Sequence, residues 1–208
     1  ILSRADLRQL ADLLHDSPAY LLSDEVYEHI VFDGEPHVSA LSIDELWQRS
    51  FVVSSVGKTY HATGWKVGYW MAPAELTAAF RKVHQFTTFA VNTPVQHALA
   101  DFLQGNPAFH ERLPAFYQEK RDLFCRLLGE SRFRLHPSRS TFFQIVDYGG
   151  ISDEEDVALA KRWTDEVGVA SIPLSVFCEQ PFTGTRLRFC FAKDDDTLAA
   201  ACEKLSRL

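Results

Sequence analysis

Apolar and polar residues follow two patterns along this chain, one typical of helices and one typical of buried strands. Leucines recur at helical spacing after Ser3 and Asp6, a pair that resembles the capping box of a helix start. Short apolar runs predict strands at 19–23, 51–55 and 67–72, and periodic segments predict helices at 41–48, 75–85 and from Thr93 onward. This alternation of helices and strands predicts an α/β fold with a mostly parallel sheet.

The sequence Gly105-Asn106-Pro107 interrupts the pattern more strongly than any other segment. We therefore expect one domain over residues 1–105 and a small α+β domain over residues 106–208. In the second domain we expect a long helix to about Glu130 that is kinked at Pro114, a strand at 141–147, a helix from a capping box at 152–155 to Gly168, strands at 169–172 and 187–192, and a terminal helix at 197–208.

Composition narrows the classes of function. The chain has 208 residues and a formal net charge of −7, and it has no dense cluster of lysine and arginine, so a nucleic-acid partner is not expected. Apolar runs are shorter than a membrane span, so no membrane partner is expected either. The four cysteines lack the CxxC spacing and lie in apolar contexts, which favours free thiols in the cytoplasm. The histidines lack the spacing of a zinc site, and we predict no metal.

Lys58 is the first candidate for chemistry. It lies in the segment 54–69, directly after the apolar run that ends at Ser55, and a second lysine, Lys66, follows in the same segment. A lysine amine becomes a nucleophile when a neighbouring cation or desolvation lowers its pKa. Two solvated lysines beside a turn are the alternative interpretation.

Four segments, in this order, carry a resemblance to a known family. They are Ser-Asp-Glu-Val-Tyr-Glu-His-Ile-Val-Phe-Asp-Gly at 23–34, the lysine segment at 54–69, Val-His-Gln at 83–85 and Arg-Leu-Arg-Phe-Cys-Phe-Ala-Lys at 186–193. Together they resemble the class I/II aminotransferases, which are pyridoxal-phosphate enzymes of fold type I. The subgroup of methionine and kynurenine aminotransferases is the most similar.

The resemblance implies a role for each cofactor ligand. Lys58 would form the Schiff base with pyridoxal 5'-phosphate and then act as acid and base. Asp24 would pair with the pyridine nitrogen, and Tyr27 would bond the phenolic oxygen of the cofactor. Ser55 and Lys66 would bind the phosphate. A turn or cap aspartate and a buried core tyrosine are the alternatives at positions 24 and 27.

The resemblance also implies two substrate contacts. Arg188 would bind the α-carboxylate of the substrate, with its neighbour Arg186 as a rival and a strand-face salt bridge as the alternative. Phe89 would reach into the substrate pocket of the second subunit of a homodimer, with Phe86 as a rival. Phe86, Phe89 and Tyr60 near the expected pocket suit an uncharged substrate side chain.

The family's glycine-rich phosphate turn, ring-stacking aromatic residue and cofactor-binding asparagine belong to a first half that we do not find in this sequence. We therefore expect the chain to be the carboxy-terminal half, with the last part of the large domain followed by the small domain. The function implied is transamination between an apolar, sulfur-containing or aromatic amino acid, methionine favoured, and a 2-oxo acid. The alternatives are a carbon–sulfur β-lyase, or a non-catalytic folded fragment unable to hold the cofactor alone.

Overall fold

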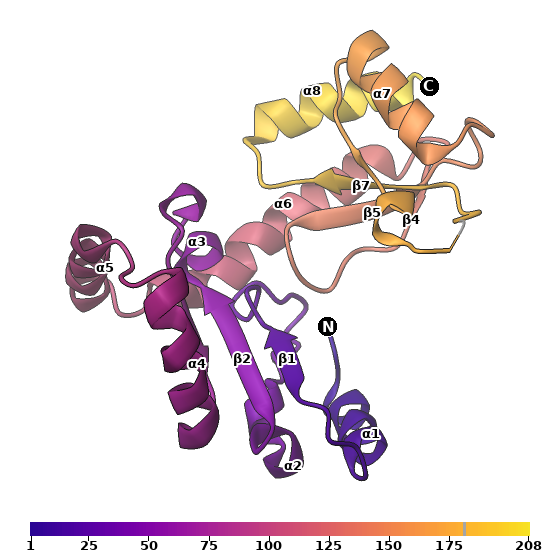
Figure 1. Cartoon of the computed structure of the whole chain (residues 1–208). Coiled ribbons are helices and arrows are strands. Elements are labelled where there is room, and N and C mark those ends of the chain that lie inside the picture. Colours follow the sequence, from indigo (N-terminus) through magenta and orange to yellow (C-terminus); the bar gives the residue numbers. More distant parts are fainter. Residues whose placement is uncertain (181) are drawn as a thin grey trace. The chain divides into compact units, whose positions relative to one another are not determined.

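The computed structural model describes residues 1–180 and 182–208, and it divides into two compact units, Ile1–Leu113 and Pro114–Leu208. Figure 1 shows both units along the chain. The predicted boundary after Gly105 coincides with the end of a helix, whereas the units divide after Leu113. Each unit is described by itself below.

The first unit alternates helices with short strands. Its elements are α1 (Arg4–Leu14), β1 (Leu21–Asp24), the 3₁₀ turn η1 (Ala40–Ser42), α2 (Asp44–Trp47), β2 (Ser50–Ser55), α3 (Val56–Thr59), η2 (Thr63–Trp65), β3 (Gly68–Met71), α4 (Ala74–Thr87), α5 (Thr93–Gly105) and η3 (Phe109–Arg112).

The strands of the first unit form a mixed sheet in the order β1-β2-β3. The pair β1–β2 is parallel, as expected, and places Asp24 opposite Val53, whereas β3 runs antiparallel to β2. A Cβ atom at Gly68 would lie 2.7 Å from the carbonyl oxygen of Ser54, so a glycine is needed where β3 approaches β2. A buried apolar cluster packs α1, η1 and α2 against β2; its members are Leu7, Ala40, Ile43, Leu46 and Val52.

The helix starts observed in the first unit agree with the sequence prediction at one helix and differ from it at two. The capping box of Ser3 and Asp6 is present at α1. The helix expected at 41–48 is two short pieces, η1 and α2, and Ser39 caps the first of them. At α5 the side chain of Asn92, one residue before Thr93, accepts the capping hydrogen bond from Val95 N.

The second unit is an antiparallel sheet with helices. Its elements are α6 (Leu113–Leu128), β4 (Arg134–Leu135), β5 (Phe143–Asp147), α7 (Asp156–Glu166), β6 (Ile172–Pro173), the 3₁₀ turn η4 (Ser175–Phe177), β7 (Arg186–Cys190) and α8 (Asp195–Ser206), with strand order β4-β5-β7-β6. Each neighbouring pair in this sheet is antiparallel. Leu187 and Phe189 of β7 are buried, which leaves Arg186 and Arg188 on the opposite face.

Two details of the second unit differ from the sequence prediction. Pro114 does not kink a long helix; it lies in the first turn of α6, which begins at Leu113 after the separate turn η3. The capping box predicted at 152–155 is also wrong, because Ser152 Oγ accepts from Glu154 N and α7 begins after Glu155.

Candidate active site

The carboxyl ends of β1 and β2 form one edge of the first sheet. Asp24 is the last residue of β1 and Ser55 is the last residue of β2, and the strands are parallel, so both lie at this edge. Helix α3 follows β2 directly and carries Lys58. Ligand chemistry in open α/β sheets lies at this kind of edge.

Lys58 and Tyr27 are brought together at the edge. The Lys58 Nζ lies over the Tyr27 ring, 5.7 Å from its centroid. Both side chains are half-buried, and Tyr27 belongs to the turn that follows β1. Lys58 is thus less exposed than a solvated surface lysine, and its role in Schiff-base chemistry stays a prediction.

A buried carboxylate that the sequence did not single out fixes the turn between Asp24 and Tyr27. Glu25 accepts hydrogen bonds from Ser23 Oγ at 2.9 Å and Ala40 N at 2.9 Å, and it lies 2.8 Å from His37 Nε2. Burial would raise the pKa of Glu25, but the hydrogen bonds, that of His37 foremost, outweigh it and lower the pKa to about 2. The carboxylate therefore stays charged and anchors the turn.

A second carboxylate ties the same turn to the sheet. Glu28 accepts hydrogen bonds from Ser54 Oγ and from the Tyr69 hydroxyl, both at 2.6 Å. Burial and the bond to Glu28 raise the pKa of Tyr69 to about 12. Glu28, which directly follows Tyr27, thereby connects this turn to β2 and β3. Its partners lie far away in the sequence, so no local signal marked it.

The lysine loop after β2 is tightly folded around Ser55. The Ser55 hydroxyl accepts from Gly57 N at 3.0 Å and donates to Val67 O at 3.4 Å. Because Val67 directly follows Lys66, this bond places the two predicted phosphate ligands on adjacent stretches of chain. Lys66 is exposed and adopts the left-handed conformation, with φ of 55°.

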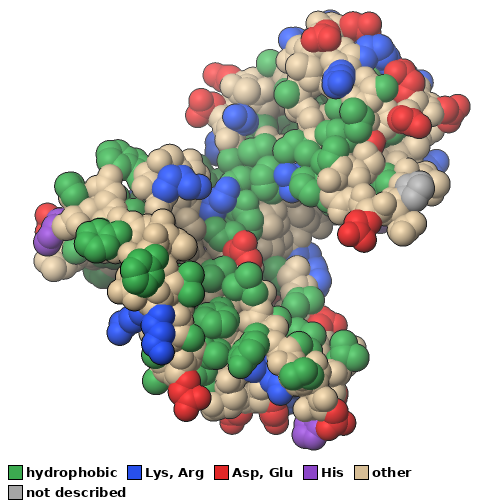
Figure 2. All heavy atoms as spheres, in the orientation of Figure 1, with side chains coloured by type: hydrophobic (Ala, Val, Ile, Leu, Met, Phe, Trp, Pro, Cys, Tyr) green, Lys and Arg blue, Asp and Glu red, His purple; other side chains and the backbone are tan. Residues whose placement is uncertain are grey.

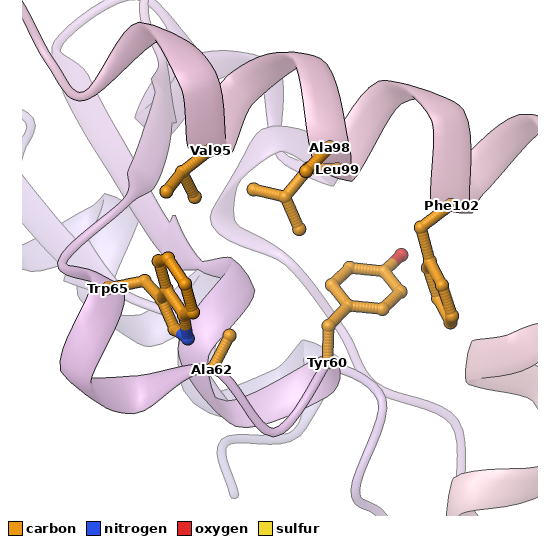
Figure 3. A pocket seen from close by; sticks show the side chains of 7 residues that line it. All are labelled: Tyr60, Ala62, Trp65, Val95, Ala98, Leu99 and Phe102. Atoms are coloured by element: carbon orange, nitrogen blue, oxygen red, sulfur yellow. The ribbon is translucent and has the colours of Figure 1, made fainter.

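An apolar cavity of about 210 Å³ lies between the lysine loop and α5 (Figure 3). The loop and the C-terminus of α3 line it on one side and α5 lines it on the other; the residues are Tyr60, Ala62, Trp65, Val95, Ala98, Leu99 and Phe102. The rings of Tyr60 and Phe102 are in edge-to-face contact, with their centroids 5.9 Å apart. Of the three aromatic residues expected near the pocket, Tyr60 lines this cavity.

Phe86 and Phe89 lie outside the cavity lining, and their side chains are 86% and 84% exposed. Phe89 also has a positive φ of 64°, unusual for a bulky residue. Figure 2 shows apolar side chains at the surface of the first unit. The role expected for Phe89 in a neighbouring subunit stays a prediction.

Arg188 lies on β7 in the second unit. Its Cζ is 4.1 Å from the centroid of the Phe143 ring and 5.0 Å from that of Phe177. The rival, Arg186, is exposed and lies opposite Asp147 in the register of β5 and β7. The two aromatic neighbours of Arg188 were not recognised in the sequence, because one of them comes from a turn after a different strand.

Metal-binding clusters and membrane-spanning helices are two further features to consider in the described residues 1–180 and 182–208. Within them we find no group of three or more histidine, cysteine, aspartate or glutamate side chains placed to hold a metal ion. Within the same residues, none of the helices is both long enough and apolar enough to span a membrane.

Comparison with known proteins decides the family. The family described as "Aminotransferase class I and II" matches residues 1–205. The chain belongs to this family. It is 49% identical to the methionine aminotransferase of Escherichia coli over 205 residues, which cover 99% of the chain and 53% of that enzyme. It is 33% identical to kynurenine–oxoglutarate transaminase 1 of Rattus norvegicus, covering 100% of the chain and 54% of that enzyme.

The structural comparison confirms the predicted fold type. A crystal structure from Escherichia coli described as having a methionine aminotransferase function superposes with a TM-score of 0.96 and 48% identity. The match covers 100% of this class I/II aminotransferase chain and 55% of the solved chain. The chain thus spans about half the length of the relatives that it matches.

Proposed function

We propose that the protein containing this chain transfers the amino group of an apolar, sulfur-containing or aromatic amino acid to a 2-oxo acid, with methionine the favoured donor. The observation that carries the proposal is the placement of Lys58 over Tyr27 at the sheet edge formed by Asp24 and Ser55. The similarity to a methionine aminotransferase supports the choice of donor.

The donor set at this edge fits pyridoxal 5'-phosphate. A hydroxyl at Ser55 and an ammonium at Lys66 are both donors suited to phosphate oxygens. A carboxylate at Asp24 suits a protonated ring nitrogen, and a phenol at Tyr27 suits an oxygen substituent. When bound, pyridoxal phosphate supplies an electron-withdrawing ring that stabilises negative charge at the α-carbon of the substrate.

The chain's own residues then hold and move protons. The carboxylate of Asp24 would stabilise a protonated ring nitrogen through its negative charge. With pyridoxal phosphate present, the Lys58 amine would be its covalent anchor, and Nζ would serve as the acid and base that holds and moves the α-proton of the substrate. Arg188 binds the α-carboxylate through two parallel N–H bonds, which orients the substrate.

The remaining parts of the proposal rest on the comparison and on the surface. The apolar cavity lined by Tyr60, Trp65 and Phe102 contains none of the predicted cofactor ligands, so the preference for an uncharged substrate side chain rests on the similarity to a methionine aminotransferase. The exposed rings of Phe86 and Phe89 favour a homodimer, because such rings gain free energy when a second subunit covers them. The free cysteines favour a cytoplasmic protein.

The direct test is product analysis with the complete gene product, supplied with pyridoxal phosphate, methionine and a 2-oxo acid. We expect the 2-oxo acid that retains the full carbon skeleton of methionine, together with a new amino acid, and no turnover in Lys58→Ala. A cysteine conjugate converted to pyruvate and a thiol, without transamination, would identify a β-lyase instead. Failure to convert any amino acid would refute both.

A further inference from the structure

Arg188 is flanked by two aromatic rings from different elements. The register of β5 and β7 pairs Ile145 with Arg188 and Phe143 with Cys190, so Phe143 is the diagonal neighbour of Arg188 on the same face. Phe177 comes from the turn η4, which follows β6. The Arg188 Cζ lies over both rings, at 4.1 Å and 5.0 Å from their centroids.

Polar groups of the protein do not account for the position of this arginine. Its Nε is buried and has no hydrogen-bond partner within the part of the chain that the structure describes. No aspartate or glutamate among the described residues forms an ion pair with it, in contrast to Arg186, whose charge acts on Asp147 across the strand pair. Within the described residues, the two rings are thus the groups that contact the Arg188 guanidinium.

The difference between an aromatic and an acidic partner has a chemical consequence. An acidic partner would use the N–H donors of the guanidinium and compete with an incoming carboxylate. An aromatic ring attracts the cation through its face and leaves those donors available. The arginine therefore keeps its charge and its bidentate geometry for an anionic ligand.

We infer that Phe143 and Phe177 are positioning residues for substrate binding, and that they hold Arg188 in place for the α-carboxylate of the substrate. This inference rests on the proposed function, in which Arg188 binds that carboxylate. Neither ring needs to touch the substrate. Phe177, 62% exposed, contributes less than the more buried Phe143, because water weakens the attraction between a cation and a ring.

The test compares variants of the complete gene product in steady-state kinetics. Phe177→Leu should raise the KM for the amino acid roughly threefold and Phe143→Leu roughly tenfold, with smaller changes in kcat. Phe177→Tyr and Phe177→Trp should restore the KM, since they keep a ring. Phe116→Leu is the matched control, because Phe116 is another exposed phenylalanine of the second unit and its ring contacts Lys120 instead; its KM should not change.

Two comparisons separate positioning from a general structural effect. In an Arg188→Leu background, Phe177→Leu should have no further effect on the KM. For 3-methylthiopropylamine, which is methionine without its carboxylate, the slow rate of amine transfer should be the same with and without Phe177→Leu. Equal losses for the amine and the amino acid, or full additivity with Arg188→Leu, would overturn the inference.

The outcomes also distinguish this inference from the proposed function. If Arg188→Leu raises the KM and the two phenylalanine variants do not, the positioning role is wrong and the carboxylate role of Arg188 stands. If Arg188→Leu leaves the KM for the amino acid unchanged, the carboxylate role fails, and the positioning role fails with it.

Discussion

Replacing Glu25 by glutamine should destabilise the protein by roughly 3 kcal/mol near neutral pH. Glu25 is 8% exposed and its side chain is held by His37, Ala40 N and Ser23. Although burial alone would raise its pKa, these hydrogen bonds lower the pKa from 4.5 to about 2. A shift of that size corresponds to roughly 3 kcal/mol of preference for the charged form in the folded state. Glutamine cannot carry this charge, and its NH2 group would replace one of the two oxygens that take part in these hydrogen bonds.

The sign of the pH dependence follows from the lowered pKa. Stabilisation by Glu25 is present above pH 4.5 and is lost as the pH falls toward 2. Urea unfolding of wild type and Glu25→Gln, measured from near neutral pH down through this window, should show a difference in the free energy of unfolding that shrinks on acidification. Glu75→Gln, an exposed change on α4, is the control and should show little difference at any pH. If the difference in the free energy of unfolding between wild type and Glu25→Gln stays constant with pH, or equals that of the control, the stabilising role of the charged Glu25 carboxylate is refuted.

Three further predictions concern the same unit. Gly57→Ala should lower the free energy of unfolding by roughly 1–3 kcal/mol, because its Cβ would lie 2.9 Å from Thr63 Cα. Gly64→Ala is the control, since a Cβ atom there has open space. Equal losses of unfolding free energy in the two variants would contradict the tight loop. Lys66→Ala should weaken pyridoxal phosphate binding roughly tenfold in a fluorescence titration, and an unchanged Kd would exclude a phosphate contact. Glu28→Gln should lower the Tyr69 pKa from about 12 toward its ordinary value of 10, measured by ultraviolet titration with Tyr69→Phe as the reference. The stabilisation that comes from the raised pKa is present below pH 10 and is lost as the pH rises to about 12. An unchanged pKa would contradict the hydrogen bond to Glu28.

Local patterns predicted the parts of the fold that depend on neighbouring residues. The apolar runs that became β1 and β2 are short and continuous, and the cap formed by Ser3 and Asp6 spans a single turn. The parallel pairing of two such strands then places their carboxyl ends at one edge, so the grouping of Asp24 with Ser55 could be predicted.

Features that depend on distant partners could not be predicted. Glu25 and Glu28 stand in the same acidic motif as Asp24, and only their contacts with His37 and Tyr69 distinguish their roles. Pro114 shows a second reason for error. Proline is tolerated in the first turn of a helix, so the same residue fits a helix start as well as a kink.

The covalent attachment of the cofactor tests the central claim most directly. The complete gene product would be incubated with pyridoxal phosphate, reduced with borohydride and digested, and the modified lysine would be identified by peptide mass spectrometry. The account predicts a phosphopyridoxyl group on Lys58, and none at that position in Lys58→Ala. Modification of Lys66 in place of Lys58, or of no lysine in a protein that still transaminates, would contradict it.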